Sequence, residues 1–174
     1  MIVLMRIYIT IFLFLFLKFA SANAEIVKSI SVNGNERITD ETVIIFTYIN
    51  VGDDLKFNDL NEIIEKLYET DFFKDVSVTL KDNVLKINVV ENSLVQSVTI
   101  NGVKNKKLKQ DLLDKLTTIE KKSYVEEKST LDTLKLSNFL KMSGYYFSNV
   151  DLKIKQNNNK TVDLIYDITL NDRA

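Results

Sequence analysis

The stretch Leu67-Tyr68-Glu69-Thr70-Asp71-Phe72-Phe73-Lys74-Asp75-Val76 decides the fold, because the spacing of the apolar side chains changes within it. Up to Tyr68 the chain carries an apolar stripe spaced at i, i+3, i+4, i+7 and i+8, formed by Leu60, Ile63, Ile64, Leu67 and Tyr68. This spacing predicts a helix with one face toward a core. From Val76 to Leu80 apolar and polar residues alternate, which predicts a strand.

Outward from this stretch, the sequence predicts a strand-helix-helix-strand-strand unit. Upstream, Ser29 to Val32 forms a short alternating strand that ends at the turn Asn33-Gly34. Thr39 is expected to cap a first helix that Gly52-Asp53 ends, and Asn58 to cap the second helix. Downstream, Asp82-Asn83 predicts the turn of a hairpin whose second strand carries Leu85, Ile87 and Val89.

This unit occurs twice in the sequence, as an internal repeat. Ser29-Ile30-Ser31-Val32-Asn33-Gly34 recurs as Ser97-Val98-Thr99-Ile100-Asn101-Gly102, and the segment from Leu67 through Phe72-Phe73 to Val76 recurs from Leu140 through Tyr145-Tyr146 to Val150. In the second copy we expect a strand over 95–100, a helix carrying Leu108, Leu112 and Leu116, and a second helix from about Thr130. A hairpin with strands 150–155 and 162–169 should follow, with its turn at Asn157-Asn158-Asn159.

The first 24 residues have the order of a secretory signal peptide. Arg6 precedes an apolar run from Ile7 to Leu17, which is short of the roughly 20 residues that a membrane-spanning helix needs. The small residues Ala22 and Ala24 predict cleavage after Ala24. An uncleaved anchor or a buried helix is the alternative for this segment.

Composition excludes several classes of function. The 174 residues include no Cys and no His, so a thiolate nucleophile, an imidazole base and ordinary zinc, copper or haem sites are ruled out. The chain carries 23 Lys and Arg against 24 Asp and Glu, with both signs interspersed. Because there is no basic stripe, we expect no nucleic-acid partner. A binding or structural role is favoured over catalysis.

Several motifs together resemble a known family. In the first copy these are Val32-Asn33-Gly34-Asn35-Glu36-Arg37-Ile38, Gly52-Asp53 and the stretch from Leu67 to Val76. In the second copy they are Gly102, Gly144-Tyr145-Tyr146 and Val150. The sequence resembles the periplasmic POTRA domains, specifically the first two repeats, of the BamA family of outer-membrane protein assembly factors.

The resemblance implies an α+β fold of tandem POTRA repeats. Each repeat is β-α-α-β-β, with a three-stranded mixed sheet covered on one face by two helices. It divides the chain into a signal peptide at 1–24, a first POTRA domain at 25–92, a second at 93–170, and the start of a next repeat at 171–174. Proteins of this family carry further repeats and a membrane β-barrel, so we expect a fragment or truncated product, or else a free-standing two-repeat protein.

One residue of the first copy departs from the family pattern. Members of the family usually have Gly at the position of Asp71, where the chain leaves the second helix. Only Gly, Asn or Asp adopts the left-handed conformation cheaply at a helix C-terminus. We therefore expect Asp71 to keep this turn with a positive φ and some strain.

The resemblance also implies a binding site on the sheet edges. In this family the last strand of each repeat is central, so the second strand, over 74–80 and 149–155, is a free edge. A free edge can accept an extended partner strand through main-chain hydrogen bonds. The residues expected to bind such a partner are Lys74, Val76, Val78, Leu80, Val150, Leu152, Lys153 and Ile154. The lysines and acids of these strands also fit an edge protected against pairing, and that alternative stays open.

The partners implied are unfolded outer-membrane β-barrel proteins, the periplasmic chaperones that deliver them, and accessory lipoproteins of the assembly machine. The implied location, after secretion across the inner membrane, is the periplasmic face of the outer membrane, with membrane attachment only through a C-terminal barrel missing from this sequence. No cofactor is expected. Two alternatives stay open: the POTRA region of a two-partner secretion pore or a TamA-like translocation factor, and a periplasmic carboxylate enzyme.

Two sets of conspicuous residues have structural interpretations. We expect the aromatic pairs Phe72-Phe73 and Tyr145-Tyr146 to belong to the cores, because large rings at a helix-to-strand junction are usually buried. We expect Asp40-Glu41 and Asp53-Asp54 to serve helix caps and turns, because a calcium site needs six to eight oxygen ligands and no loop in this sequence has the spacing of an EF-hand.

Overall fold

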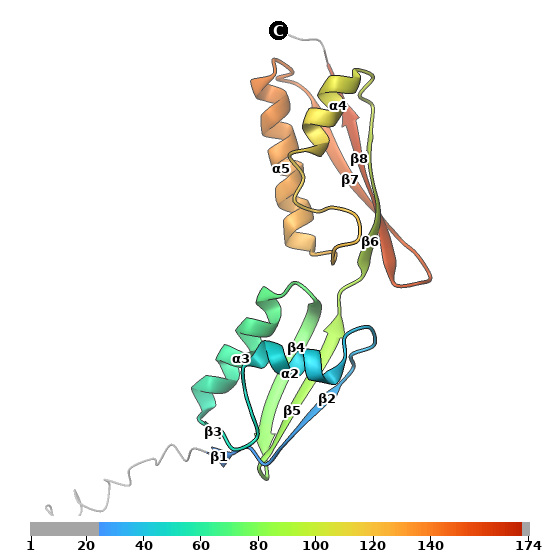
Figure 1. The fold of residues 1–174 in the computed structure, drawn as a ribbon. Coiled ribbons are helices and arrows are strands. Elements are labelled where there is room, and N and C mark those ends of the chain that lie inside the picture. The colour runs from blue at the N-terminus through green and yellow to red at the C-terminus, as the bar shows by residue number, and fades with distance from the viewer. Residues whose placement is uncertain (1–24, 172–174) are drawn as a thin grey trace, which may run out of the picture.

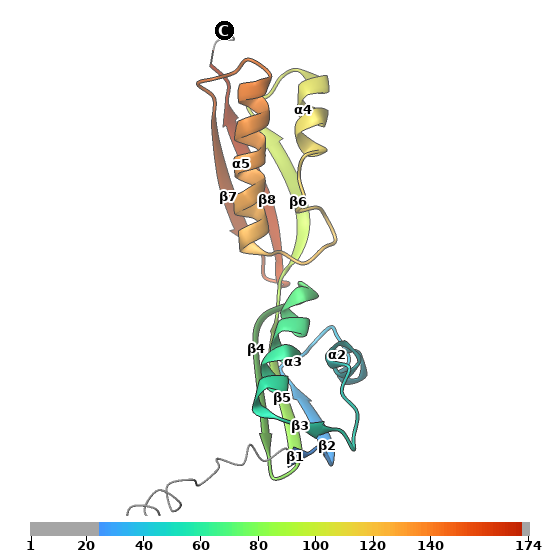
Figure 2. The same cartoon turned by 90° about the vertical axis from the view of Figure 1, so that its left-hand side faces the viewer.

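A computed structural model describes residues 25–171 of the protein. The predicted signal peptide and all but the first residue of the predicted start of a next repeat lie outside this range. Two units follow each other end to end, and only Asn92 and Ser93 connect the last strand of the first to the first strand of the second (Figure 1). Each unit is a sheet with its helices on one face (Figure 2).

The first unit has the predicted order of strands and helices, with one small addition. It consists of β1 (Glu25–Ile26), β2 (Ser29–Asn33), α2 (Asp40–Thr47), β3 (Asp54–Leu55), α3 (Phe57–Glu69), β4 (Phe73–Lys81) and β5 (Val84–Glu91). The main sheet has the order β2-β5-β4, in which β5 pairs parallel with β2 and antiparallel with β4. The added strands β1 and β3 form a separate two-stranded sheet, and their two residues each are too few to show an alternation in the sequence.

The second unit repeats this architecture. It consists of β6 (Leu94–Asn101), α4 (Lys106–Leu113), α5 (Glu126–Met142), β7 (Asn149–Gln156) and β8 (Thr161–Thr169). The sheet has the order β6-β8-β7, again with the last strand in the centre, parallel to one neighbour and antiparallel to the other. The predicted fold class is therefore confirmed in both units.

Each unit has its own hydrophobic core between the sheet and the helices. In the first unit Leu67 of α3 packs with Ile87 of β5, and in the second Leu140 of α5 packs with Leu164 of β8, all with 0% exposure. Burying such a side chain contributes roughly 1.5–3 kcal/mol relative to leaving it exposed. No described residue belongs to both clusters, so each unit is stabilised by its own core.

The helix ends agree with the sequence only in part. Thr39 caps α2 as predicted, because its Oγ1 accepts a hydrogen bond from the Thr42 N–H at 3.3 Å. Asn58 does not cap α3. The helix begins two residues earlier than that cap implies, at Phe57, and the Asp59 carboxylate accepts from the Lys56 N–H at 2.7 Å. The acid at the third position of the helix thus accepts the N–H of the cap residue, as in one half of a capping box.

Two further boundaries in the second unit differ from the prediction. Helix α5 begins at Glu126 rather than near Thr130, and its first turn carries Glu126 and Glu127, where acids favour the positive end of a helix. Helix α4 ends at Leu113, so Leu116 lies beyond it. Leu116 is still buried, because the chain after α4 turns back over the core.

The repeated Asn-Gly turn has a steric cause in both units. Gly34 and Gly102 have φ of 85° and 81°, a region that other residues enter at a cost. A Cβ atom at Gly34 would lie 2.1 Å from the Val89 carbonyl oxygen, and one at Gly102 would lie 1.7 Å from that of Ile168. Only glycine fits where the first strand of each unit passes the end of the central strand.

Within 25–171 no helix is long and apolar enough to cross a membrane.

Candidate functional site: two free sheet edges and the junction between them

The two candidate binding strands each have an unpaired side. Strand β4 pairs only with β5, and β7 only with β8, so each is an edge of its sheet. The opposite edge of the second sheet is partly covered: the Val95 N–H donates to the Lys122 carbonyl oxygen and the Lys121 N–H to that of Val95, both at 2.8 Å. Strand β7 is therefore the more open edge of its sheet.

The turn after β4 determines which of its main-chain groups face outward. Asp82 and Asn83 both have positive φ, 52° and 64°, and form the two-residue turn between Lys81 and Val84. In such a hairpin the closing pair is hydrogen-bonded, and hydrogen-bonded pairs then alternate along the ladder. Val76, Val78 and Leu80 consequently direct their N–H and C=O groups to the free side.

A contact at the start of β4 supports this assignment independently. The Val76 N–H donates to the Tyr68 hydroxyl at 3.2 Å, so it points away from β5. Tyr68 lies in α3 and is 42% exposed. The chain itself therefore occupies the first outward donor of this edge with a side-chain oxygen.

The same reasoning assigns β7. The Asn157 N–H donates to the Thr161 carbonyl oxygen at 2.9 Å, so this pair is hydrogen-bonded and the pairs alternate from there. The main-chain N–H and C=O groups therefore face outward at Val150, Leu152 and Ile154. Those of Lys153 face inward and bond to its partner Ile165 on β8. Lys74, the last of the predicted binding residues, lies at an irregularity of the β4–β5 register between Phe73 and Asp75.

Side chains of these strands limit what a partner could recognise. Val76, Val78 and Val150 are buried at 7%, 8% and 8% exposure, while Ile154 is 40% exposed. The edge of β4 therefore offers its main chain rather than its apolar side chains, whereas β7 adds an exposed isoleucine.

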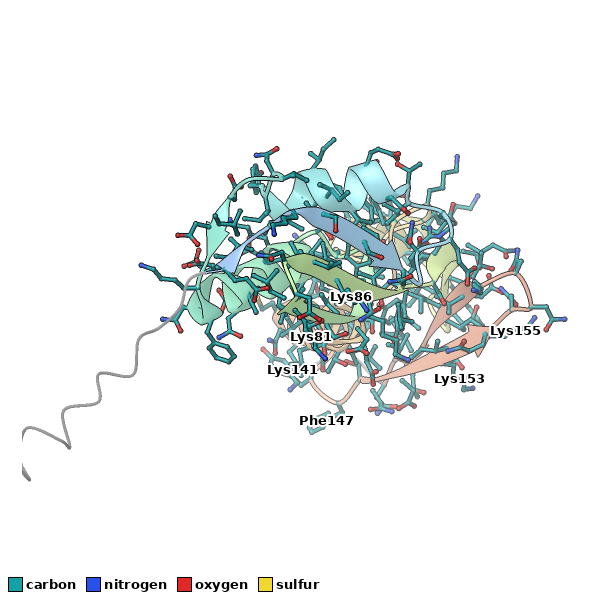
Figure 3. All side chains as sticks on the ribbon, turned by 90° about the horizontal axis from the view of Figure 1, so that it is seen from below. Lys81, Lys86, Lys141, Phe147, Lys153 and Lys155 are labelled. Atoms are coloured by element: carbon teal, nitrogen blue, oxygen red, sulfur yellow. The ribbon has the colours of Figure 1, made fainter. Side chains whose placement is uncertain are left out.

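The lysines of β7 lie on the open face of the sheet. Figure 3 shows the side chains of Lys153 and Lys155 extending away from this strand. Lys153 forms an ion pair with Asp167 of β8 at 2.6 Å. The hydrogen bond raises the pKa of Lys153 and lowers that of Asp167, and both groups are open to solvent.

Glu91 fixes the end of the first unit at the junction. Its Oε1 accepts the N–H groups of Glu36, Arg37 and Ile38 at 2.7–3.0 Å, and its Oε2 pairs with the Arg37 guanidinium at 2.8 Å. Burial raises the pKa of Glu91, but these three hydrogen bonds and Arg37 outweigh it and hold the pKa below its usual value. Arg37 also donates to the Asn92 carbonyl oxygen at 2.8 Å, so the connection is held from the same side chain.

Two ion pairs join the units across the junction. Lys128 of α5 pairs with Asp71, and Lys160 of the β7–β8 turn pairs with Glu36. Asp71 also lines a cleft of about 660 Å³, which residues of both units form. The end of β7, at Ile154 and Gln156, and the start of β4, at Phe73 and Lys74, line this cleft together.

Asp71 has the predicted backbone conformation, with φ of 62°. Its counterpart in the second unit is Gly144, with φ of 93°. The ion pair of Asp71 with Lys128 was not foreseen. Nothing in the pattern of one repeat indicates what the next repeat brings near it.

The expectation that both residues of each aromatic pair are core residues is wrong. Phe73 is buried at 2%, but Phe72 is 38% exposed and stacks on Phe46 with ring centroids 5.6 Å apart. Tyr145 is half-buried and Tyr146 is 56% exposed. Phe73 begins β4 and turns into the core while the preceding Phe72 does not, whereas Tyr145 and Tyr146 lie in the turn before β7, where only Tyr145 packs against the core.

The acids do not gather into a cation site in the part of the chain that the structure describes: no three carboxylates there are close enough to hold a metal ion. Asp53 instead accepts from the Asn50 N–H at 2.8 Å, as a turn residue.

Known proteins resemble this chain in part of its sequence and in its fold. Residues 93–170 match the POTRA family, described as a surface antigen variable number repeat. The N-terminal domain of Omp85 from Thermosynechococcus elongatus has the same fold, with a TM-score of 0.54 and 16% identity over 81% of this chain and 61% of that one. POTRA domains 3–5 of Haemophilus influenzae BamA give a TM-score of 0.50 and 16% identity, over 90% and 70% of the two chains. Residues 93–170 therefore match the POTRA family, and the chain has the fold of POTRA domains.

Two curated relatives are named outer membrane protein assembly factor BamA. The one from Neorickettsia risticii is 29% identical over 98 residues, 56% of this chain and 13% of the relative. The one from Neisseria meningitidis serogroup B is 35% identical over 78 residues, 45% of this chain and 10% of the relative. These matches confirm the resemblance to POTRA domains of the BamA family, and the chain spans about an eighth or less of the length of these relatives.

Proposed function

We propose that this chain is the periplasmic POTRA portion of an outer-membrane protein assembly factor, with repeats at 25–92 and 93–170. It receives unfolded β-barrel proteins by strand addition and scaffolds assembly partners, namely periplasmic chaperones and accessory lipoproteins. The names of the two BamA relatives support the assembly role. The observation that carries strand addition is the outward main chain of Val76, Val78 and Leu80 on β4 and of Val150, Leu152 and Ile154 on β7.

Strand addition suits clients of varied sequence. An added strand gains its affinity from main-chain hydrogen bonds, and pockets for alternate side chains supply specificity. On β4 the buried valines leave little side-chain surface for such pockets. The edge is therefore suited to recognise any extended chain with free N–H and C=O groups, as an unfolded barrel strand has.

Proline substitution tests this function on β4. Val78→Pro removes an outward N–H that a docked strand would need, without removing a β4–β5 hydrogen bond. We expect it to weaken binding of a peptide from an unfolded barrel protein several-fold more than Val78→Ala does. Binding is measured by chemical-shift changes on residues 25–174, after circular dichroism has shown that both variants keep the fold.

The register supplies a matched control on β7. Lys153→Pro and Leu152→Pro are neighbours, but the Lys153 N–H bonds inward to β8 and the Leu152 N–H faces the free side. Lys153→Pro should therefore lower the free energy of unfolding, whereas Leu152→Pro should lower peptide binding. Shift changes that spare both edge strands and lie on the helices would contradict strand addition.

A further inference from the structure

The two free edges lie on the same flank of the molecule and meet at the junction. In Figure 2 β4 and β7 are on one side, and β2 and β6 on the other. Strand β7 runs toward the junction and β4 runs away from it, since Gln156 at the end of β7 and Phe73 at the start of β4 line the same cleft. Both edge strands therefore have the same direction, one after the other, with the cleft between them.

The two edges also present the same alternation. On β4 the residues with outward main chains, Val76 and Val78, turn their side chains into the core of the first unit. On β7 Val150 and Leu152 do the same in the second unit. A client strand in which apolar and polar residues alternate can thus place its apolar side chains on the helix-covered side of both sheets, with the same alternation along both edges.

The cleft offers hydrogen-bonding groups between the end of β7 and the start of β4. Tyr68, Ser93 and Gln156 line it with polar side chains, next to the apolar surface of Val125 and Ile154. Its volume of about 660 Å³ lies within the range of about 300–1,000 Å³ typical of ligand-binding clefts. An extended chain that spans the gap between β4 and β7 can satisfy its main-chain groups here.

Contacts across the junction hold the two edges in place. The connection has only Asn92 and Ser93, and Arg37 is bonded to both Glu91 and Asn92. The pairs Lys128–Asp71 and Lys160–Glu36 add one link from α5 and one from the β7–β8 turn. A preorganised pair of edges costs a client less ordering free energy than two independent ones.

We propose that one extended segment of an unfolded barrel protein pairs with β4 and β7 in succession and passes through the junction cleft. This inference rests on the proposed function, strand addition. Strands of 9 and 8 residues and the cleft between them set the length of the segment at about 20 residues. Because antiparallel pairing is the more stable per residue, the N-terminal half of the segment lies on β4 and the C-terminal half on β7.

A labelled peptide tests the order of the two halves. A peptide of about 20 residues from an outer-membrane barrel protein carries a nitroxide at its N-terminus or at its C-terminus, and amide line broadening is recorded on residues 25–174. The N-terminal label should broaden β4 near Lys81, and the C-terminal label should broaden β7 near Asn149. If each label broadens both strands equally, the segments bind independently and the proposal is overturned.

Peptide length provides the second measurement. Joining two binding segments can raise affinity by about 10²–10⁴-fold, so the whole peptide should bind at least about 10-fold more tightly than either half. Val78→Pro should reduce its affinity to that of a half peptide, and Val78→Ala should not. If the halves still shift β4 and β7 but the whole peptide gains nothing, the continuous path is wrong and strand addition stands. If no peptide shifts either edge, both are wrong.

Discussion

Tyr68 shows how one side chain can regulate a sheet edge. Its position at i+8 of the α3 stripe predicts a core residue, but its side chain is 42% exposed. Its hydroxyl, however, accepts the outward N–H of Val76 and thereby occupies the place that a client carbonyl oxygen would take. Edge strands are commonly protected against indiscriminate pairing, and here one hydroxyl protects the end of β4 nearest the cleft.

Tyr68→Phe is expected to strengthen client binding. The substitution removes the hydroxyl and leaves the Val76 N–H free for a partner. Since a hydrogen bond contributes about 0.5–1.5 kcal/mol net, affinity should rise by roughly 2- to 10-fold and the free energy of unfolding should fall by a similar amount. Titration with an unfolded barrel peptide and urea melts measure the two effects. Tyr146→Phe, at an exposed tyrosine, is the control, and weaker binding by Tyr68→Phe would contradict this role.

Asp71 combines backbone strain with a contact between the units. Its φ of 62° costs about 1 kcal/mol for a residue with a Cβ atom, and glycine would remove that cost. Glycine would also remove the ion pair with Lys128, which is exposed and contributes about 0.2–1 kcal/mol. The two effects oppose each other in the intact chain.

Asp71→Gly should therefore change the stability of the chain little, but should stabilise it in a Lys128→Ala background. We expect a gain of about 0.5–1 kcal/mol in that background, where the ion pair is already absent and relief of strain is only partly offset by the entropy of the unfolded chain. Urea melts of the four chains of this double-mutant cycle give the result. An equal effect in both backgrounds would show that the ion pair contributes nothing.

At the scale of secondary-structure elements, much of the fold could be predicted from the sequence. The change of period after Tyr68 and the repeated Asn-Gly turn predict the order of strands and helices in both units. The ends of helices were harder to predict, because side chains before the first turn and side chains within it can both fix where a helix begins. At α3 the Asp59 carboxylate, inside the helix, accepts the N–H of the cap residue Lys56.

The spacing of apolar residues does not predict which polar side chains connect two elements. Asp132 of α5 is fully buried. The apolar periodicity of this helix would instead predict an exposed position for a charged residue. Its carboxylate accepts the N–H groups of Thr117 and Thr118 at 2.9 and 2.7 Å and pairs with Lys135 at 2.9 Å. It thus attaches the chain that follows α4 to α5. Similarly, the outward main chain of β4 followed from the turn geometry and not from the alternation of side chains.

Asp132 makes the second unit sensitive to acid. Burial raises the pKa of this carboxyl. Its hydrogen bonds to Thr117, Thr118 and Lys135 lower the pKa by more than burial raises it, so the pKa of Asp132 lies below the usual value of 3.8. Because the pKa is lower in the folded chain than in the unfolded chain, ionisation favours folding. This contribution is complete above the unfolded pKa and is lost as the pH falls through the folded pKa.

Asp132→Asn is expected to destabilise the second unit by about 3 kcal/mol at pH 7, because an amide cannot accept all of these hydrogen bonds and loses the charge. The difference between the variant and the natural chain should shrink as the pH falls below about 4. Urea melts between pH 3 and 7, followed by amide signals of β8, measure both effects. A difference independent of pH would show that the charge of Asp132 does not contribute.

At the scale of the whole molecule, the two units have separate cores and are joined by polar contacts. No residue of either described core packs across the junction, so the relative orientation depends on the short connection, on Arg37 and on two exposed ion pairs. Exposed ion pairs weaken as salt screens them, whereas hydrophobic cores do not. The orientation of the repeats should therefore respond to salt while the folds of the repeats do not.

Raising the salt concentration from about 0.05 to 1 M should broaden the distribution of distances between the units, since the screening length falls to about 3 Å at 1 M. Spin labels on exposed positions of the two units, read by pulsed electron resonance, measure this distribution. The distance distribution of the variant Lys128→Ala/Lys160→Ala should be broad at both salt concentrations, because both ion pairs are already absent.

If one client segment binds both edges, adding it should narrow the distance distribution at 1 M salt again, since a bound strand replaces the lost ion pairs with hydrogen bonds on both sides of the cleft. A distribution that stays narrow at 1 M salt would show that Arg37 and the two-residue connection are sufficient to orient the repeats.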